Sequence, residues 1–190
     1  MGLIRRILSS LFLWPYCLVA LLGVCSSCAR DATRYEDGSA AEWVETLPEP
    51  ALHHPVIAGA TVAPDSCRPG DRVTLCVGVR VAGGHYLHPP EEQDSHFTPV
   101  GVSVSLPPGL SAVGAWRYPE PTHTSSGASR YEGNLVFSRS LRVSRSVKST
   151  PIRFEVVLRH QACSDELCWS PTEVALPVTI AIESNKEAKQ

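Results

Sequence analysis

Two cysteines near the C-terminus, Cys163 and Cys168, are the residues best suited to chemistry, and four residues separate them. Four residues suffice for a chain reversal, so the two Cα atoms could approach within the roughly 4.4–6.8 Å that a disulfide requires. Closing so short a loop removes little entropy from the unfolded chain, so this bridge would stabilise the fold less than a long-range one. At an exposed tip, one sulfur is open to attack by another protein's thiolate. The spacing therefore indicates thiol–disulfide exchange, with a purely structural disulfide as the alternative.

Two further cysteines, Cys67 and Cys76, lie on either side of a Pro69-Gly70 turn. A tight hairpin at that turn would bring Cys67 closer to Arg72 than to Cys76. A structural disulfide between Cys67 and Cys76 is one interpretation. Two separate thiols, or thiols that pair with other molecules, are the alternative, and a redox function is the least favoured.

The first 27 residues have the features of an export signal: a basic start, an apolar run from Ile7 to Val24, and then small residues. The basic residues stay on the cytoplasmic side while the apolar run enters the membrane. The segment Ser26-Ser27-Cys28 resembles the lipobox of bacterial lipoproteins, so we expect lipidation at Cys28. Cys25 fits that pattern less well because Val24 precedes it. Plain secretion and an uncleaved membrane anchor remain open.

Export places the remaining cysteines where thiols oxidise, which favours disulfides over free thiols. We therefore expect a signal peptide over 1–27, a polar linker over 28–54, one domain over 55–183 and a polar tail over 184–190. The expected location is the periplasm or outer cell envelope, with attachment to the membrane through lipid. The His53-His54 pair is interpreted as part of an exposed linker rather than as a metal site.

Apolar and polar residues alternate with a period of two through the expected domain, which is typical of half-buried antiparallel strands. The alternating segments are 73–81, 100–106, 141–143, 152–158 and 174–182. With 55–62 and 135–137 added, about seven strands result, and turn-like Pro-Gly and Ser-Gly sequences separate them. No window predicts a convincing amphipathic helix. The expected fold is an all-β, immunoglobulin-like sandwich.

The composition excludes several other classes of protein. Of the 190 residues, 43% are hydrophobic and 19% are charged, so the chain has enough apolar residues to form a packed core. The 13 glycines and 16 prolines argue against a coiled coil and against a nucleotide-binding α/β fold. A net charge of −2 gives no reason to expect a nucleic-acid partner.

The stretch 161–171 resembles the cysteine motif of the N-terminal periplasmic domain of DsbD, the thiol:disulfide interchange protein. The family pattern is Gln-x-Cys, a short spacer, a second Cys, and then x-Pro-Pro. The matching residues are Gln161, Cys163, Cys168 and Pro171, and Ser170 stands in place of the first proline. The segment 84–88, Gly-His-Tyr-Leu-His, is similar to the family's Gly-aromatic-Tyr-Leu-Tyr strand. The resemblance extends over about 56–182.

The resemblance implies that Cys163 and Cys168 accept electrons from a membrane electron carrier or a thioredoxin-like protein. The pair would then reduce oxidised periplasmic thiol proteins. Full-length members of the family continue into a membrane domain and a thioredoxin-like domain, so we expect the electron source to act in trans here. The residues that the resemblance places near the pair are Tyr86, His88, Gln161, Asp165, Trp169 and Pro171. A mobile aromatic cap would fall near Trp116 or Tyr118.

Thiol–disulfide exchange requires no cofactor, and the protein would be an enzyme only as a protein-disulfide reductase. The acids Asp165 and Glu166 between the cysteines would disfavour a thiolate. No metal site is expected, because His85 and His88, three positions apart on a strand, face opposite sides. His160 is interpreted as an ordinary strand residue rather than a base. The non-enzymatic alternative is a binding or scaffold lipoprotein whose disulfides are purely structural.

Overall fold

The computed structural model of the protein describes residues 37–90, 96–148 and 150–184. The expected signal peptide, the lipidation site Cys28, the start of the linker and the tail from 185 onwards lie outside these ranges. No helix within the described ranges is long and apolar enough to cross a membrane.

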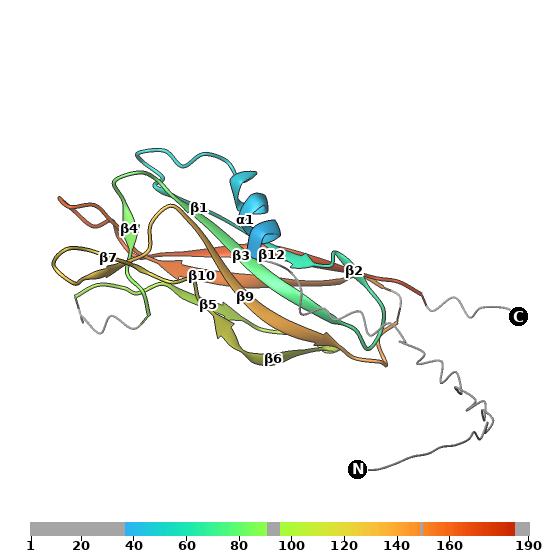
Figure 1. The fold of residues 1–190 in the computed structure, drawn as a ribbon. Coiled ribbons are helices and arrows are strands. Elements are labelled where there is room, and N and C mark those ends of the chain that lie inside the picture. Colours follow the sequence, from blue (N-terminus) through green and yellow to red (C-terminus); the bar gives the residue numbers. More distant parts are fainter. Residues whose placement is uncertain (1–36, 91–95, 149, 185–190) are drawn as a thin grey trace, which may run out of the picture. The chain divides into compact units, whose positions relative to one another are not determined.

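Two four-stranded sheets form the domain, as predicted for an all-β sandwich (Figure 1). The first sheet has the order β1 (Val56–Ala63), β3 (Arg72–Val81), β9 (Asn134–Val143) and β6 (Leu110–Arg117). The second has the order β2 (Ser66–Cys67), β12 (Thr172–Ile182), β10 (Ile152–His160) and β5 (Gly101–Val104). Neighbouring strands are antiparallel except β2 and β12, which are parallel.

Alternate residues of the central strands supply a single hydrophobic core between the sheets. On β3 the inward residues include Val73, Leu75 and Val77, and on β10 they include Val156 and Leu158, all fully buried. Each such side chain stabilises the fold by roughly 1.5–3 kcal/mol relative to an exposed one. The period-two pattern thus predicted both the strands and the side of each strand that faces the core.

Strand β6 was missed by the sequence pattern, and two predicted segments turn out to be one strand. The segments 135–137 and 141–143 are both parts of β9. Strand β6 shows no alternation of buried and exposed residues, and its register against β9 shifts between Val113 and Arg117. Gly114 lies inside this irregular stretch with a φ of 77°, a conformation that glycine adopts without a Cβ penalty. An edge strand that is bulged and half-exposed leaves no periodic signal.

Helix α1 (Asp37–Glu45) corrects the expectation of a polar linker over 28–54. The helix packs on the outer face of the first sheet, and Val44 is fully buried there. Gly59 and Gly78 are direct partners in the β1–β3 ladder. Together they leave room for the Trp43 ring, since a Cβ on Gly78 would come within 2.6 Å of that ring. A short helix whose contacts depend on glycines elsewhere in the chain gives little signal in its own sequence.

Arg80 on β3 holds the end of helix α1 in place. Its guanidinium donates hydrogen bonds to the backbone carbonyls of Glu45 at 3.1 Å and Leu47 at 2.7 Å, and it also pairs with Glu49. Cationic groups are favourable at helix C-termini because the last carbonyls lack partners within the helix. The segment that follows the helix is therefore bound to the domain as well.

Cys67 and Cys76 are both free thiols, so the suggested structural disulfide between them is wrong. Cys67 belongs to the hydrophobic core and lies on β2 of the second sheet. Cys76 lies on β3 of the first sheet, in the alternate row that includes Gly78 and faces α1. Cys67 thus lies in the core between the two sheets, whereas Cys76 lies on the outer face of the first sheet, so the first sheet separates the two thiols. Burial is the main cause that raises the pKa of each thiol to about 11, so both stay protonated at neutral pH.

Candidate functional site

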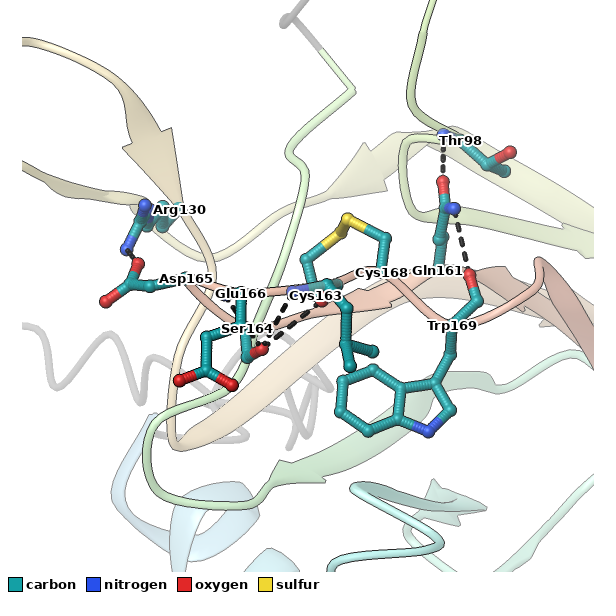
Figure 2. The surroundings of a disulfide bond; sticks show 10 residues. Thr98, Arg130, Gln161, Cys163, Ser164, Asp165, Glu166, Cys168 and Trp169 are labelled. Carbon is teal, nitrogen blue, oxygen red and sulfur yellow. Dashed lines mark hydrogen bonds and ion pairs between the residues drawn. A yellow bond between two sulfur atoms is a disulfide. The ribbon is translucent and has the colours of Figure 1, made fainter.

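A disulfide joins Cys163 to Cys168 at the tip of a short hairpin (Figure 2). The S–S distance is 1.98 Å and the two Cα atoms are 4.0 Å apart. Cys163 lies on β11 (Ala162–Cys163), and the chain reverses directly after it. The hairpin is closed by hydrogen bonds from the Trp169 N–H to the Ala162 carbonyl at 2.9 Å and from the Ser164 N–H to the Leu167 carbonyl at 2.8 Å.

The hydroxyl of Ser164 organises the turn between the two cysteines. It accepts hydrogen bonds from the backbone N–H groups of Glu166 and Leu167, each at 3.2 Å. It also donates to the Leu167 carbonyl at 3.3 Å. Serine commonly stabilises turns in this way, because its short side chain can bond to the backbone two or three residues on.

The two sulfur-bearing residues differ in exposure. Cys163 is fully buried and pairs with Tyr86 of β4 (Tyr86–Leu87) in a two-stranded ladder. Cys168 is only partly buried, and its neighbour Leu167 is 52% exposed. Cys168 is therefore the more accessible of the two cysteines.

Gln161 connects the base of the hairpin to the segment that precedes β5. Its side-chain carbonyl accepts a hydrogen bond from the Thr98 N–H at 2.7 Å, and its amide nitrogen donates to the Trp169 carbonyl at 2.9 Å (Figure 2). Both bonds are partly buried, so they fix the position of the hairpin against the sandwich. The glutamine of the motif thus has a structural role beside the cysteines.

Three aromatic rings meet next to the disulfide. One ring nitrogen of His88 and the sulfur atoms of Cys163 and Cys168 all lie within 4.8 Å of one another. The His88 ring stacks on Phe97 with a centroid distance of 4.4 Å and contacts the Tyr86 ring edge-on at 5.4 Å. Phe97 was not singled out from the sequence, where it follows a run of polar residues.

His85 and His88 contact different parts of the hairpin. The ring of His85 lies 4.9 Å from that of Trp169, whereas His88 lies at the sulfur atoms. The two histidines, which flank β4, are thus separated despite their closeness in sequence.

Arg130 compensates for part of the negative charge at the hairpin tip. Its guanidinium donates to the Asp165 carboxylate at 3.1 Å and lies over the Tyr86 ring, 3.8 Å from the centroid. Arg130 belongs to the two-stranded ladder of β7 (Thr122–His123) and β8 (Ser129–Arg130). Nothing in the local sequence links it to Asp165, because the two residues lie 35 positions apart.

The two residues expected near a cap, Trp116 and Tyr118, have other partners in the structure. Tyr118 contacts Phe137 edge-on at 5.6 Å, and the guanidinium of Arg139 lies 6.0 Å from the Trp116 ring. Neither contact involves the disulfide, so a capping role for these rings stays a prediction. Pro171 is exposed just before β12 and gives the hairpin a rigid exit.

A pocket of about 210 Å³ lies beside the hairpin. It is lined by His53, His54, His160 and Trp169, among others. His160 is buried, and burial lowers its pKa, so the ring is neutral at neutral pH. In the described part of the chain, Nδ1 of His160 has no hydrogen-bond partner.

The fold and the site define an immunoglobulin-like domain with a disulfide at a hairpin tip. No protein-family model matches the chain, and a search of curated proteins finds no match. Among solved structures, the N-terminal periplasmic domain of ScsB from Proteus mirabilis is similar, with 17% identity and a TM-score of 0.42 over 64% of this chain. The chain spans only 44% of that structure.

Two further solved structures are similar at lower identity and lower TM-score. The first is the complex between the DsbD and PilB N-terminal domains from Neisseria meningitidis, with 14% identity, a TM-score of 0.40, and coverage of 67% of this chain and 84% of that one. The second is a family 123 glycoside hydrolase from Clostridium perfringens, with 10% identity, a TM-score of 0.34, and coverage of 67% and 27%.

Proposed function

We propose that this protein is an exported thiol–disulfide exchange protein whose Cys163–Cys168 pair passes electrons from a dithiol donor to oxidised proteins of the cell envelope. The observation that carries the proposal is the unequal exposure of the two cysteines at the hairpin tip. Exchange requires one sulfur that an incoming thiolate can reach and a second that is held close enough to resolve the intermediate.

Reduction of the pair proceeds in two balanced steps. The donor's thiolate attacks Sγ of Cys168, the Cys163–Cys168 bond breaks, and Cys163 leaves as a thiolate that takes up a proton. The donor's second thiol then attacks the donor's first sulfur, which is bonded to Cys168 in the mixed disulfide. This step releases Cys168 as a thiol and the donor as a disulfide. The reduced pair then transfers its electrons to the substrate: Cys168 attacks the substrate's disulfide, and Cys163 resolves the resulting mixed disulfide.

The surface around the tip favours contact with another protein. Leu167 projects from the turn, and Phe97, 36% exposed, lies against His88 beside the sulfur atoms. Exposed apolar side chains next to a reactive group are suited to a short-lived protein–protein contact. Asp165 and Glu166 add charge at the rim of this surface, where it steers encounter more than it adds affinity.

The location and the partners of the exchange reaction are part of the same proposal. The leader supports export to the periplasm or outer cell envelope, with Cys28 as the lipidated residue. The donor would be a membrane electron carrier or a thioredoxin-like protein. Incorporation of a labelled fatty acid into the wild-type chain, and its loss in Cys28→Ser, would test the anchor.

Trapping of mixed disulfides tests the exchange reaction itself. In cells, Cys163→Ser leaves the accessible Cys168 and should accumulate mixed disulfides that mass spectrometry can identify. Cys168→Ser leaves only the buried Cys163 and should trap several-fold less. Cys76→Ser, which removes a buried thiol outside the site, is the control for background. Equal trapping by all three variants would refute the proposed roles.

Reduction by a dithiol protein separates exchange from a purely structural disulfide. The folded protein should be reduced by a thioredoxin-like donor within minutes, whereas a structural disulfide should resist until the domain unfolds. Alkylation of the released thiols followed by mass measurement gives the reduced fraction directly.

A further inference from the structure

The reduced form of the cysteine pair has a chemistry that the oxidised form lacks. We propose that Cys163 and Cys168, once reduced, bind a soft or borderline d¹⁰ cation, Zn²⁺ or Cu⁺, together with His88. This inference requires only that the disulfide can be reduced, and chemical reduction suffices, so it does not depend on the exchange partners proposed above.

The geometry already brings the three ligands together. One ring nitrogen of His88 and both sulfur atoms lie within 4.8 Å of one another. Around a tetrahedral zinc, with Zn–S near 2.3 Å and Zn–N near 2.0–2.1 Å, neighbouring ligand atoms are separated by about 3.5–3.8 Å. Rotation of the freed cysteine side chains covers this difference without moving the strands.

The ring of His88 is held in place before any ion arrives. It is stacked on Phe97 with an angle of 6° between the planes, and it also contacts the edge of the Tyr86 ring. The backbone carbonyl of His88 also accepts a hydrogen bond from the Val100 N–H at 2.8 Å. Ligands on packed, hydrogen-bonded elements bind more tightly because little entropy is lost when the ion binds.

The type of ligand decides which ions fit. Two thiolates and an imidazole favour Zn²⁺ or Cu⁺ over Mg²⁺ and Ca²⁺, which prefer oxygen ligands. The nearby carboxylate of Asp165 is engaged by Arg130 and points away from the disulfide (Figure 2). The described residues thus offer three ligands, and the fourth position of a zinc ion would be open to water.

Metal binding follows reduction of the disulfide in two separate steps. A dithiol donor reduces the disulfide, giving two thiols on this protein and one disulfide on the donor. Binding of Zn²⁺ then forms two Zn–S bonds and one Zn–N bond, and two thiol protons pass to the solvent. Because the same sulfur atoms would carry out exchange, bound metal and exchange exclude each other.

Zinc binding by this chain, in a variant in which Ser replaces Cys17, Cys25 and Cys28, tests the proposal. The protein is reduced with a phosphine, freed of it under argon, and titrated with Zn²⁺ against a chromophoric chelator. The reduced protein should bind one zinc per chain, at least about 100-fold more tightly than the oxidised protein. Cys67 and Cys76 are thiols in both states, so this difference excludes them. Cu⁺ delivered from its own chelator is the second probe.

Matched histidine variants identify the third ligand. His88→Gln should weaken zinc binding by at least about tenfold, as expected for loss of a ligand. His85→Gln removes a neighbouring buried histidine that contacts Trp169 instead, and it should bind like the parent. If His88→Gln matches the parent, or if the reduced and oxidised proteins bind equally, the proposal is overturned.

An NMR measurement on the unaltered histidines covers the case in which His88→Gln fails to fold. Addition of Zn²⁺ to the reduced protein should shift the imidazole resonances of His88 and leave those of His53 and His123 in place. Unshifted His88 signals at saturating zinc would contradict the site. Failure of a thioredoxin-like donor to reduce the pair would count against the proposed exchange function and leave this result unaffected.

Discussion

Arg130 sets the charge beside the disulfide. Its guanidinium bonds to Asp165 and covers the ring of Tyr86, which itself pairs with Cys163. The sequence alone shows only the acids Asp165 and Glu166 in this region, and from them a thiolate is expected to be disfavoured. The structure adds a cation that offsets one of these charges. The electrostatic potential at the hairpin tip therefore depends on both Arg130 and Asp165, and loss of either charge should change it.

Opposite charge changes at this ion pair should alter the exchange rate in opposite directions. Arg130→Gln leaves Asp165 uncompensated and should slow reduction by a dithiol donor, because a leaving thiolate is less stable near negative charge. Asp165→Asn should speed the reaction. Each effect should be up to about fivefold, since partly exposed ion pairs contribute roughly 0–1 kcal/mol.

Stopped-flow reduction at two salt concentrations measures these rates. Both effects should shrink as salt screens the charges. Glu155→Gln, which removes an acid from strand β10, is the control and should react like the parent. Rates that shift in the same direction for Arg130→Gln and Asp165→Asn would contradict an electrostatic origin.

The turn between the cysteines is the element that holds the two sulfurs together. Three hydrogen bonds of the Ser164 hydroxyl support it in the oxidised form. Ser164→Ala should loosen the turn and make the disulfide easier to reduce. In a less ordered turn the two reduced cysteines meet less often, so their effective concentration, which favours the disulfide, is lower. With a net value of about 1 kcal/mol for the lost bonds, the reduction potential should rise by roughly 20 mV.

Equilibration with glutathione buffers measures this potential. Ser170→Ala, outside the turn, serves as the matched control and should keep the parent's value. A potential unchanged in Ser164→Ala would mean that the turn is equally ordered when the pair is reduced.

Helix α1 offers a second test at the level of elements. In Gly78→Ala, the new Cβ would come within 2.5 Å of Val44 and 2.6 Å of the Trp43 ring, so the helix must shift or detach. The free energy of unfolding should fall by about 1–3 kcal/mol, as is usual for overpacking. Gly83→Ala is the control, because nothing lies within 4 Å of its Cβ position.

Urea unfolding measures both glycine variants. Gly83→Ala should be as stable as the parent or slightly more stable, because alanine restricts the unfolded chain. If Gly78→Ala is also unchanged, helix α1 does not contribute to the stability of the domain.

The elements that the sequence predicted are those whose signal is local. The strands β3, β10 and β12 follow from their alternation, and the hairpin follows from the spacing of Cys163 and Cys168. Helix α1 was missed because its contacts depend on glycines of the sheet. Arg130 and Phe97 were missed because only the folded chain brings them to the hairpin. Residues that act through tertiary contacts leave no periodic trace.

For the molecule as a whole, the buried His160 links stability to pH. Its position at the end of β10 places it beside the pocket near Trp169, and burial lowers its pKa from the usual value of 6.5. The folded protein therefore binds this proton more weakly than the unfolded chain does. Stability from the neutral ring is fully present above about pH 6.5, and it is lost as the pH falls from 6.5 toward the lowered pKa.

Measurements of unfolding against pH should show this dependence. Between pH 6.5 and the lowered pKa, His160 should reduce the free energy of unfolding of the wild type by up to about 1.4 kcal/mol per pH unit. His160→Gln cannot take up the proton, so its curve should be flatter over the same range. His123→Gln, which removes an exposed histidine, should keep the wild-type slope. Because acidic residues contribute equally to all three proteins, the difference between the curves isolates His160. Parallel curves for His160→Gln and the wild type from pH 5 to 8 would show that the buried ring is protonated equally in the folded and unfolded states.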